Sequence, residues 1–192
     1  MRNGPHFQSA KTLTHTVSSP SDLLQKLERE LWRAFHHNNR AHKADHFYNF
    51  CITALALKDH FFEWKGIVTK AAKQPHYDAW SSIAELVAAC EIANTSKHAV
   101  LRESKSGALK TPKTSRVRAS TSSVVNIYTD GNGKFEIVKN ARAPSISIEF
   151  EGSRRFDLYE FMESIVKYWR GYLTEQGVPL KRQRARTLYG DA

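Results

Sequence analysis

Features typical of several protein classes are missing from this chain. Its 192 residues include only two cysteines, Cys51 and Cys90, and both fall within helical patterns, which excludes a disulfide framework. No apolar run approaches the ~20 residues that a membrane-crossing helix needs. Residues 1–20 lack the apolar core of a secretory signal. These absences predict a cytoplasmic protein that has no contact with a membrane.

The motifs of common enzyme classes are also absent. The chain has no glycine-rich phosphate loop, no Gly-x-Ser-x-Gly element and no kinase-like set of motifs. Gly131-Asn132-Gly133 belongs to a predicted hairpin turn rather than to a nucleotide-binding loop. We therefore expect no cofactor.

Several histidines lie at the start of the second predicted helix, as a zinc site would require. His42 and His46 are one helical turn apart, with Asp45 between them and His36 and His37 close by. A zinc site needs a third ligand in register, but His-Glu-x-x-His is absent and no cysteine pair has ligand spacing. The sequence predicts exposed histidines at a helix start and no bound metal.

The excess positive charge is confined to three segments. The formal net charge is +10, and the excess lies in residues 1–20, 102–122 and 177–192. Such segments attract phosphate backbones without reading base sequence, and salt weakens the attraction; equally, they keep a protein soluble. The predicted partner is RNA or another acidic molecule. The expected contact residues are Arg116, Arg118, Lys181, Arg182, Arg184 and Arg186.

Two long helices are predicted in the first third of the chain. Ser19 can cap the first, Pro20 suits its first position, and Asp22 falls three residues after the cap. Residues 36–39 have poor helix propensity and form the predicted connection. The second helix is expected over residues 41–64 and is apolar around much of its circumference, as in the centre of a bundle.

The rest of the chain predicts a third helix, a loop, strands and a last helix. Pro75 opens the third helix, whose apolar stripe continues to Leu101. Asp157 and Glu160 form a capping box for the last helix, which ends before Gly177. Three strands are expected between them, at residues 124–128, 135–138 and 145–150.

The predicted fold class is α+β and mostly α. The simplest assembly is a four-helix bundle with a small antiparallel β-sheet inserted before the last helix. The expected organisation is a flexible N-terminus over residues 1–18, a single helical-bundle domain over residues 19–176 and a basic C-terminal tail over residues 177–192. Within the domain, residues 102–122 form a basic flexible loop and residues 123–155 form the sheet insertion.

One group of polar residues falls on predicted apolar helix faces. Asn94 lies four residues after Cys90, and His98 lies four after Asn94, so both share the buried stripe. Asp59 precedes Phe62 by three and borders apolar surface on the second helix. Buried polar groups need hydrogen-bond partners, so Asp59 is expected to meet Asn94 or His98 if the helices pack.

This cluster has a structural and a functional interpretation. In the first, Asp59 and His98 form a buried polar pair that fixes the helix register. In the second, His98 transfers a proton, Asp59 orients it, and Lys97 lies near an anionic substrate. The structural interpretation is favoured, because buried polar pairs are far commoner than catalytic ones.

Two segments resemble a group of uncharacterised bacterial and phage proteins. These are residues 49–60, Asn-Phe-Cys-Ile-Thr-Ala-Leu-Ala-Leu-Lys-Asp-His, and residues 92–98, Ile-Ala-Asn-Thr-Ser-Lys-His. The group pairs an Asn-Ala…Asp segment on one helix with an Ala-Asn-x-x-Lys-His segment on another. Strands and a Trp-containing C-terminal helix follow, as in residues 165–169 here. The resemblance covers most of the chain from about Leu23 to Leu173 and implies no particular activity.

The helical layout is more loosely similar to HEPN domains, which often serve as ribonucleases in toxin and phage-defence systems. Those enzymes use Arg, a polar residue and then His on a late helix. The predicted third helix offers Asn94, Lys97 and His98 without the arginine. Arg40 and His46 have about the required separation, but they open the second helix.

Three functions are therefore predicted. The first is an accessory helical domain, of phage or mobile-element origin, that binds a protein or nucleic acid through its basic loop and tail. The second is a HEPN-like ribonuclease with Asp59, Asn94, Lys97 and His98 at its site. The third is a purely structural or assembly protein, in which the same four residues hold the bundle together.

Overall fold

The structure is a computed structural model that describes residues 17–97, 111–129 and 135–182. This part of the chain confirms the predicted class, mostly α with a small antiparallel sheet before the last helix. None of its helices combines the length and apolar character that a membrane crossing requires. The elements are α1 (Pro20–His36), α2 (Arg40–Lys65), α3 (Lys70–Ser81), α4 (Ala84–Lys97), β1 (Thr114–Thr129), β2 (Phe135–Phe150), the 3-10 turn η1 (Glu151–Ser153), β3 (Arg154–Asp157) and α5 (Leu158–Glu175).

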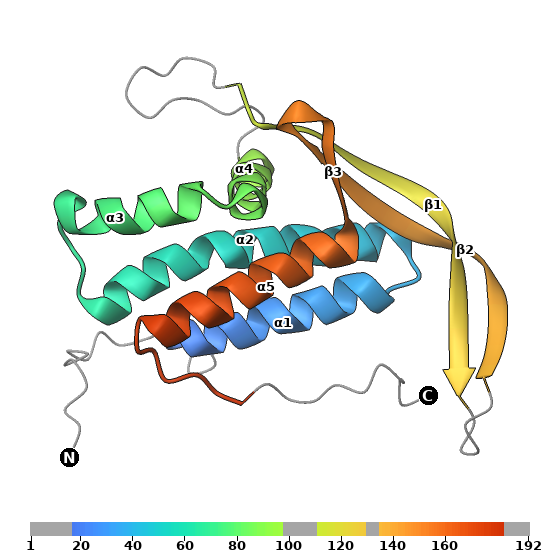
Figure 1. The fold of residues 1–192 in the computed structure, drawn as a ribbon, viewed down its shortest axis with the longest axis horizontal. Helices are drawn as coiled ribbons and strands as arrows, with labels where there is room; N and C mark the ends of the chain where they lie inside the picture. The colour runs from blue at the N-terminus through green and yellow to red at the C-terminus, as the bar shows by residue number, and fades with distance from the viewer. Residues whose placement is uncertain (1–16, 98–110, 130–134, 183–192) are drawn as a thin grey trace.

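Helices α1, α2 and α5 lie side by side and form the base of the molecule (Figure 1). Helix α1 runs in the opposite direction to the other two, so the C-terminal end of α1 meets the N-terminal ends of α2 and α5. Helices α3 and α4 cover α2. The sheet lies beside the end of the bundle at which α1 finishes and α2 and α5 begin. The α1–α2 turn therefore lies beside β1, several residues after the strand begins at Thr114, where Arg40 bonds to Ala119.

A single apolar core joins the helices to the inner face of the sheet. Its largest fully buried side chains are Trp80, Trp169, Phe47, Phe50, Phe61, Phe62, Phe156 and Phe161. The rings of Trp80 on α3 and Trp169 on α5 are 5.5 Å apart, centroid to centroid. Ile148 and Phe156 bring the sheet into the same core. The sheet is therefore fixed on the bundle by apolar burial, which is the main favourable term in folding.

The predicted N-terminal cap of α1 and the short connection to α2 are confirmed. The Ser19 hydroxyl accepts from the amide of Asp22 at 3.2 Å and donates to its carboxylate at 2.8 Å. After α1 ends at His36, the Asn39 side chain caps α2 by accepting from the amides of Ala41 and His42. Side-chain oxygens thus satisfy backbone donors that have no partner within either helix.

A buried lysine of α2 caps the C-terminus of α1, where backbone carbonyls have no partner within the helix. The Lys43 ammonium donates to the carbonyl oxygens of Ala34 at 2.6 Å and Phe35 at 2.7 Å. The Lys43 residue is only 5% exposed, and this burial lowers the pKa of its side chain. A cation at a helix C-terminus also interacts favourably with the helix dipole. Lys43 therefore ties the start of α2 to the end of α1.

The third predicted helix is two helices in the structure, and Pro75 lies inside α3 instead of opening it. The first of them begins earlier, where the Thr69 side chain accepts from the amide of Ala72. It ends where the hydroxyls of Ser81 and Ser82 donate to carbonyl oxygens of the preceding turn. Such bonds compete with the helical ladder, which explains why the chain turns before α4.

The boundaries predicted for the loop and strands were also wrong. Strand β1 begins at Thr114, within the range expected to be a loop. Two predicted strands are parts of the single strand β2, which continues through Pro144, and the third strand is the short β3. Few apolar residues alternate in residues 114–122, so no period-2 pattern marks this part of β1 in the sequence.

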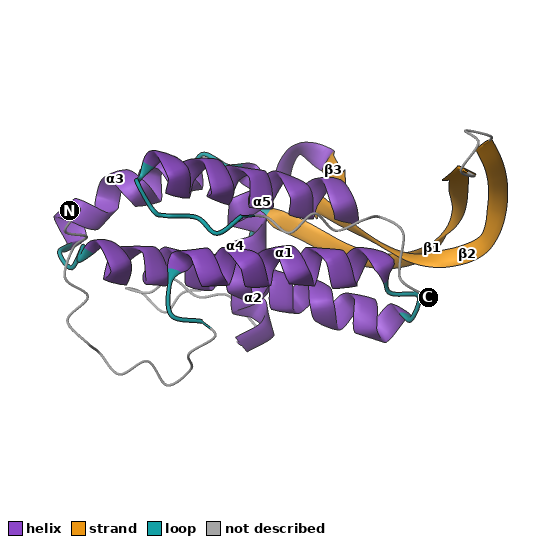
Figure 2. Cartoon of the chain, turned by 90° about the horizontal axis from the view of Figure 1, so that it is seen from below, coloured by secondary structure: helices purple, strands orange, loops and turns teal. Residues whose placement is uncertain are grey.

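The long strands extend past the helices as a two-stranded ribbon (Figures 1 and 2). The sheet order is β1-β2-β3, with antiparallel neighbours. Strand β3 pairs only with residues 147–150 of β2. We define the ribbon as residues 119–129 of β1 and 135–146 of β2, which continue beyond that pairing. At ~3.3 Å per residue each strand of the ribbon is about 35 Å long.

Replacing Lys43 with Met is expected to lower the free energy of unfolding by about 1–3 kcal/mol, because the carbonyls of Ala34 and Phe35 would lose their donor. Urea denaturation followed by circular dichroism measures this change. Lys70→Met on the exposed start of α3 is the matched control, expected within about 0.5 kcal/mol of wild type. Equal values for the two variants would contradict the capping role.

Candidate nucleic-acid interface

The outer face of the sheet carries exposed arginines. Val117 pairs across the strands with Ile148, which faces the core, so Arg116 and Arg118 alternate to the opposite face. Both arginines are exposed. Within the described part of the chain, neither of them takes part in an ion pair. These two residues, predicted to lie in a basic flexible loop, therefore have fixed positions on strand β1.

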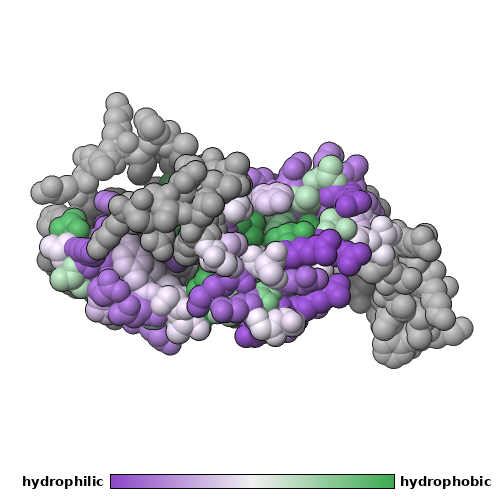
Figure 3. Space-filling model, turned by 90° about the horizontal axis from the view of Figure 1, so that it is seen from above, coloured by the Kyte–Doolittle hydropathy of each residue, from purple (hydrophilic) through white to green (hydrophobic). Residues whose placement is uncertain are grey.

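Cross-strand pairing places both signs of charge on this face. Arg116 lies opposite Glu149, which in turn lies opposite Arg155 on β3. The Arg155 guanidinium donates to the buried Ser147 hydroxyl at 3.2 Å. Seen from above, strongly hydrophilic residues gather toward the sheet end of the described surface (Figure 3). The outer face is therefore polar and carries more arginine than carboxylate at its centre.

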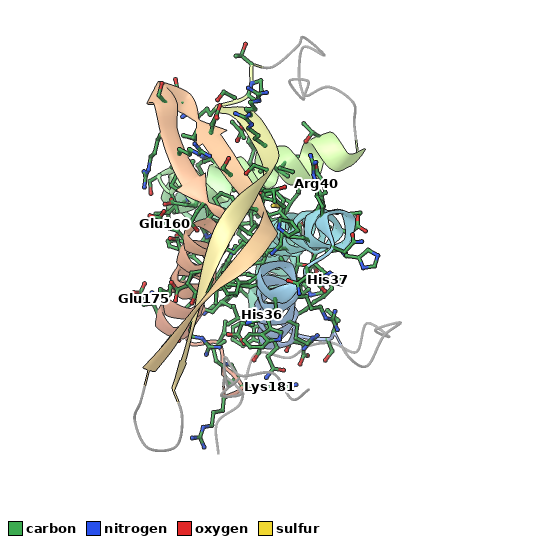
Figure 4. The ribbon with its side chains drawn as sticks, turned by 90° about the vertical axis from the view of Figure 1, so that its right-hand side faces the viewer. His36, His37, Arg40, Glu160, Glu175 and Lys181 are labelled. Atoms are coloured by element: carbon green, nitrogen blue, oxygen red, sulfur yellow. The ribbon has the colours of Figure 1, made fainter. Side chains whose placement is uncertain are left out.

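The α1–α2 turn adds further basic and aromatic groups beside this face. Arg40, the first residue of α2, donates to the carbonyl oxygen of Ala119 on β1, with an N–O distance of 3.4 Å. This bond joins the turn to the residue that follows Arg118. Figure 4 shows His36, His37 and Arg40 to the right of the ribbon, while Glu160 of α5 lies on the other side. The turn therefore contacts β1 through this one bond, next to the strand position of Arg118.

A buried carboxylate organises the base of the turn. Glu30 is 4% exposed and accepts from Arg33 at 3.1 Å and from His46 Nδ1 at 2.8 Å. The rings of His37 and His42 lie 4.7 Å apart, centroid to centroid. Sequence spacing placed His42 and His46 on one helix face but did not reveal their partners. Glu30 comes from α1 and His37 from the connection that follows it, so only the packing of the two helices could identify these partners.

Of the predicted polar cluster, the structure describes the side chains of Asp59 and Asn94. Asp59 is exposed, so its expected burial was wrong, while Asn94 is half-buried. No hydrogen bond between these two side chains is found in the described part of the chain. The side chain of Lys97 and the whole of His98 lie outside the described residues, so their predicted roles stay predictions. The faces of α2 that carry Leu57 and Phe61 are the buried ones.

A histidine that is hydrogen-bonded between helices lies elsewhere, between α3 and α5. His76 Nδ1 is hydrogen-bonded to the Tyr172 hydroxyl. Burial raises the pKa of Tyr172 to about 12, and burial lowers the pKa of His76. Both groups are therefore neutral near pH 7, and the phenol donates to the imidazole. This pair is surrounded by aromatic rings of the core and has a structural role.

Another buried carboxylate fixes the start of the sheet. Glu91 on α4 is 5% exposed, and its two oxygens accept from the amides of Lys113 at 3.0 Å and Thr114 at 2.8 Å. Charge-assisted bonds of this kind are stronger than neutral ones. A glutamate within the apolar stretch of α4 indicates that a buried carboxylate needs hydrogen-bond donors. The sequence does not show that these donors are the amides of Lys113 and Thr114.

The start of the C-terminal tail is held on the N-terminus of α1. The Lys181 ammonium is bonded to the Asp22 carboxylate, and its amide donates to the Ser21 hydroxyl at 2.9 Å. Burial alone would raise the pKa of Asp22, but hydrogen bonds from Lys181, Ser19 and Ser18 outweigh it and lower the pKa to about 2. This contact compensates the charge of Lys181, at the opposite end of the bundle from the α1–α2 turn.

The remaining predicted contacts of the tail are Arg182, Arg184 and Arg186. Arg182 is exposed, whereas Arg184 and Arg186 lie outside the described residues. Their assignment to a nucleic-acid interface stays a prediction. Of the six predicted contact residues, the structure therefore describes Arg116, Arg118, Lys181 and Arg182.

Metal ligands do not cluster in the described part of the chain. Among residues 17–97, 111–129 and 135–182, no group of three or more His, Cys, Asp or Glu side chains could hold a metal ion.

Comparison of the chain with protein-family models, with curated proteins and with solved structures finds no match.

The different surroundings of Glu91 and Asp59 give a direct test. Glu91→Ala is expected to lower the free energy of unfolding by about 1–3 kcal/mol, because two backbone donors lose a buried acceptor. Asp59→Ala is expected to change it by less than about 0.5 kcal/mol, because the side chain is exposed. Chemical denaturation measures both. A large loss for Asp59→Ala would restore the predicted structural role of this residue.

Proposed function

We propose that this protein binds nucleic acid through the outer face of its sheet and the adjoining α1–α2 turn. The observation that carries the proposal is the pair of exposed arginines, Arg116 and Arg118, at the base of a two-stranded ribbon that extends past the helices. Arginines on alternate strand positions face the same way and can bind phosphates in succession.

The shape of the ribbon supports a double helix as the bound form. The major groove of B-DNA is about 12 Å wide and admits a two-stranded β-ribbon. The corresponding groove of duplex RNA is deep and narrow and excludes side chains. Duplex DNA therefore fits the ribbon better than duplex RNA does, and contacts to phosphates supply affinity without base specificity.

The salt dependence of binding tests the role of the arginines. With a labelled duplex of about 20 base pairs, longer than the ribbon at ~3.4 Å per pair, fluorescence anisotropy gives the affinity over a range of salt concentrations. Arg116→Gln combined with Arg118→Gln is expected to reduce the slope of log K against log salt by about 2, because two phosphates are no longer neutralised.

The matched control removes the same charge from other parts of the surface. Lys70→Gln combined with Lys167→Gln changes exposed residues on α3 and α5 and is expected to leave the slope within experimental error of wild type. Similar losses in both double variants would show that net charge alone governs the attraction. Tighter binding of duplex RNA than of duplex DNA would contradict the fit to the groove.

Ribonuclease activity stays a prediction for the cluster of Asp59, Asn94, Lys97 and His98. It needs a separate readout, because a nucleic-acid-binding protein need not cleave its ligand. Gel analysis of a mixed RNA pool after incubation with wild type and with His98→Ala gives that readout. Cleavage by wild type alone, with similar thermal melts for both proteins, would support the enzyme over a simple binding protein.

A further inference from the structure

The α1–α2 turn contains two histidines whose hydrogen bonds require the neutral imidazole. The amide of Asn39 donates to His37 Nδ1 at 3.2 Å, so this nitrogen carries no hydrogen. Neutral His37 then carries its hydrogen on Nε2, which lies 3.2 Å from His42 Nδ1. His37 is thus the donor and His42 the acceptor, and a proton added to either accepting nitrogen breaks the chain.

The surrounding charges also favour the neutral pair. The titratable and charged groups that flank the pair are Glu30, Arg33 and His36 from α1 and Arg40, Lys43, Asp45 and His46 from α2. The His46 ring lies 5.8 Å from the His37 ring, centroid to centroid. Glu30 already accepts from Arg33 and His46, so its charge is largely compensated. Loss of hydration, followed by the charges of His42, His46 and Lys43, lowers the pKa of His37 below the ordinary value of 6.5. His37 is therefore neutral near pH 7 and takes up a proton on acidification.

The position of the pair links it to the sheet. Arg40, between the two histidines in sequence, donates to the carbonyl of Ala119 on β1. Arg118 on the outer face immediately precedes that residue. His37 and Arg40 lie at the same end of the bundle, to one side of the ribbon (Figure 4). One hydrogen bond therefore connects the segment that carries the pair to the strand that carries Arg116 and Arg118.

We propose that His37 and His42 form a proton-dependent phosphate site that extends the nucleic-acid interface. The inference rests on the proposed function, because the ligand is the phosphodiester backbone of the same nucleic acid. When the pair is neutral, each imidazole is engaged by the other. When it is protonated, the two rings repel each other, separate, and donate charge-assisted hydrogen bonds to phosphate oxygens.

Linkage gives the direction of the pH effect. A polyanion binds the protonated form better, so binding takes up protons and tightens as pH falls. Each further phosphate that the protein neutralises steepens the slope of log K against log salt by about 0.9. Wild type is therefore expected to show a steeper slope at about pH 5.5 than at about pH 7.5, by up to about 0.9 for each imidazole that gains a proton and binds a phosphate.

The test compares these slopes in histidine variants, with the same duplex of about 20 base pairs as the probe. His37→Gln combined with His42→Gln keeps polar side chains at the turn but cannot be protonated, so its slope is expected to be the same at both pH values. The single variant His42→Gln changes an exposed side chain and is expected to lose at least half of the pH effect. His60→Gln, near the other end of α2, is the control that retains it.

The outcomes distinguish this inference from the proposed function. A wild-type slope that does not change with pH, or a double variant that steepens as much as wild type, would overturn the phosphate site. DNA binding that persists without this pH effect leaves the proposed function standing. Absence of DNA binding at both pH values would overturn both. Circular dichroism at the two pH values confirms that each protein is folded during the measurement.

Discussion

The contact of Lys43 with the end of α1 is the constraint on which the rest of the arrangement depends. Its buried ammonium satisfies the carbonyls of Ala34 and Phe35 and holds the first two helices in one register. The chain between them is then too short to adopt many conformations. As a result, Arg40 and the neighbouring histidines occupy defined positions at one end of the bundle. A polar contact inside the fold thereby determines a feature of its surface.

Two buried carboxylates have a similar organising effect on either side of the interface. Glu91 accepts from two backbone amides where the chain enters β1, and Glu30 accepts from side chains of both α1 and α2. Buried charges are stable only with such partners. These contacts therefore compensate the buried carboxylates and fix the start of β1 and the α1–α2 turn in place.

The proposed interface combines permanent and titratable charge. Guanidinium groups such as those of Arg116 and Arg118 carry a permanent charge, whereas the proposed phosphate site of His37 and His42 gains charge only on protonation. The bond between Arg40 and Ala119 joins the two groups across elements that are distant in sequence. Binding strength would then depend on salt through the arginines and on both salt and pH through the histidines.

The sequence determined the helix caps, the α1–α2 connection and the last helix, because these depend on side chains a few residues apart. Ser19, Asn39 and Asp157 act on amides within their own helices. Tertiary structure decided the length of β1, whose strand depends on pairing with β2 because its own apolar pattern is weak. It also decided the partners of His46 and Lys43, and the exposure of Asp59. Helical periodicity places a residue on a face, but only packing shows which face is covered and by what.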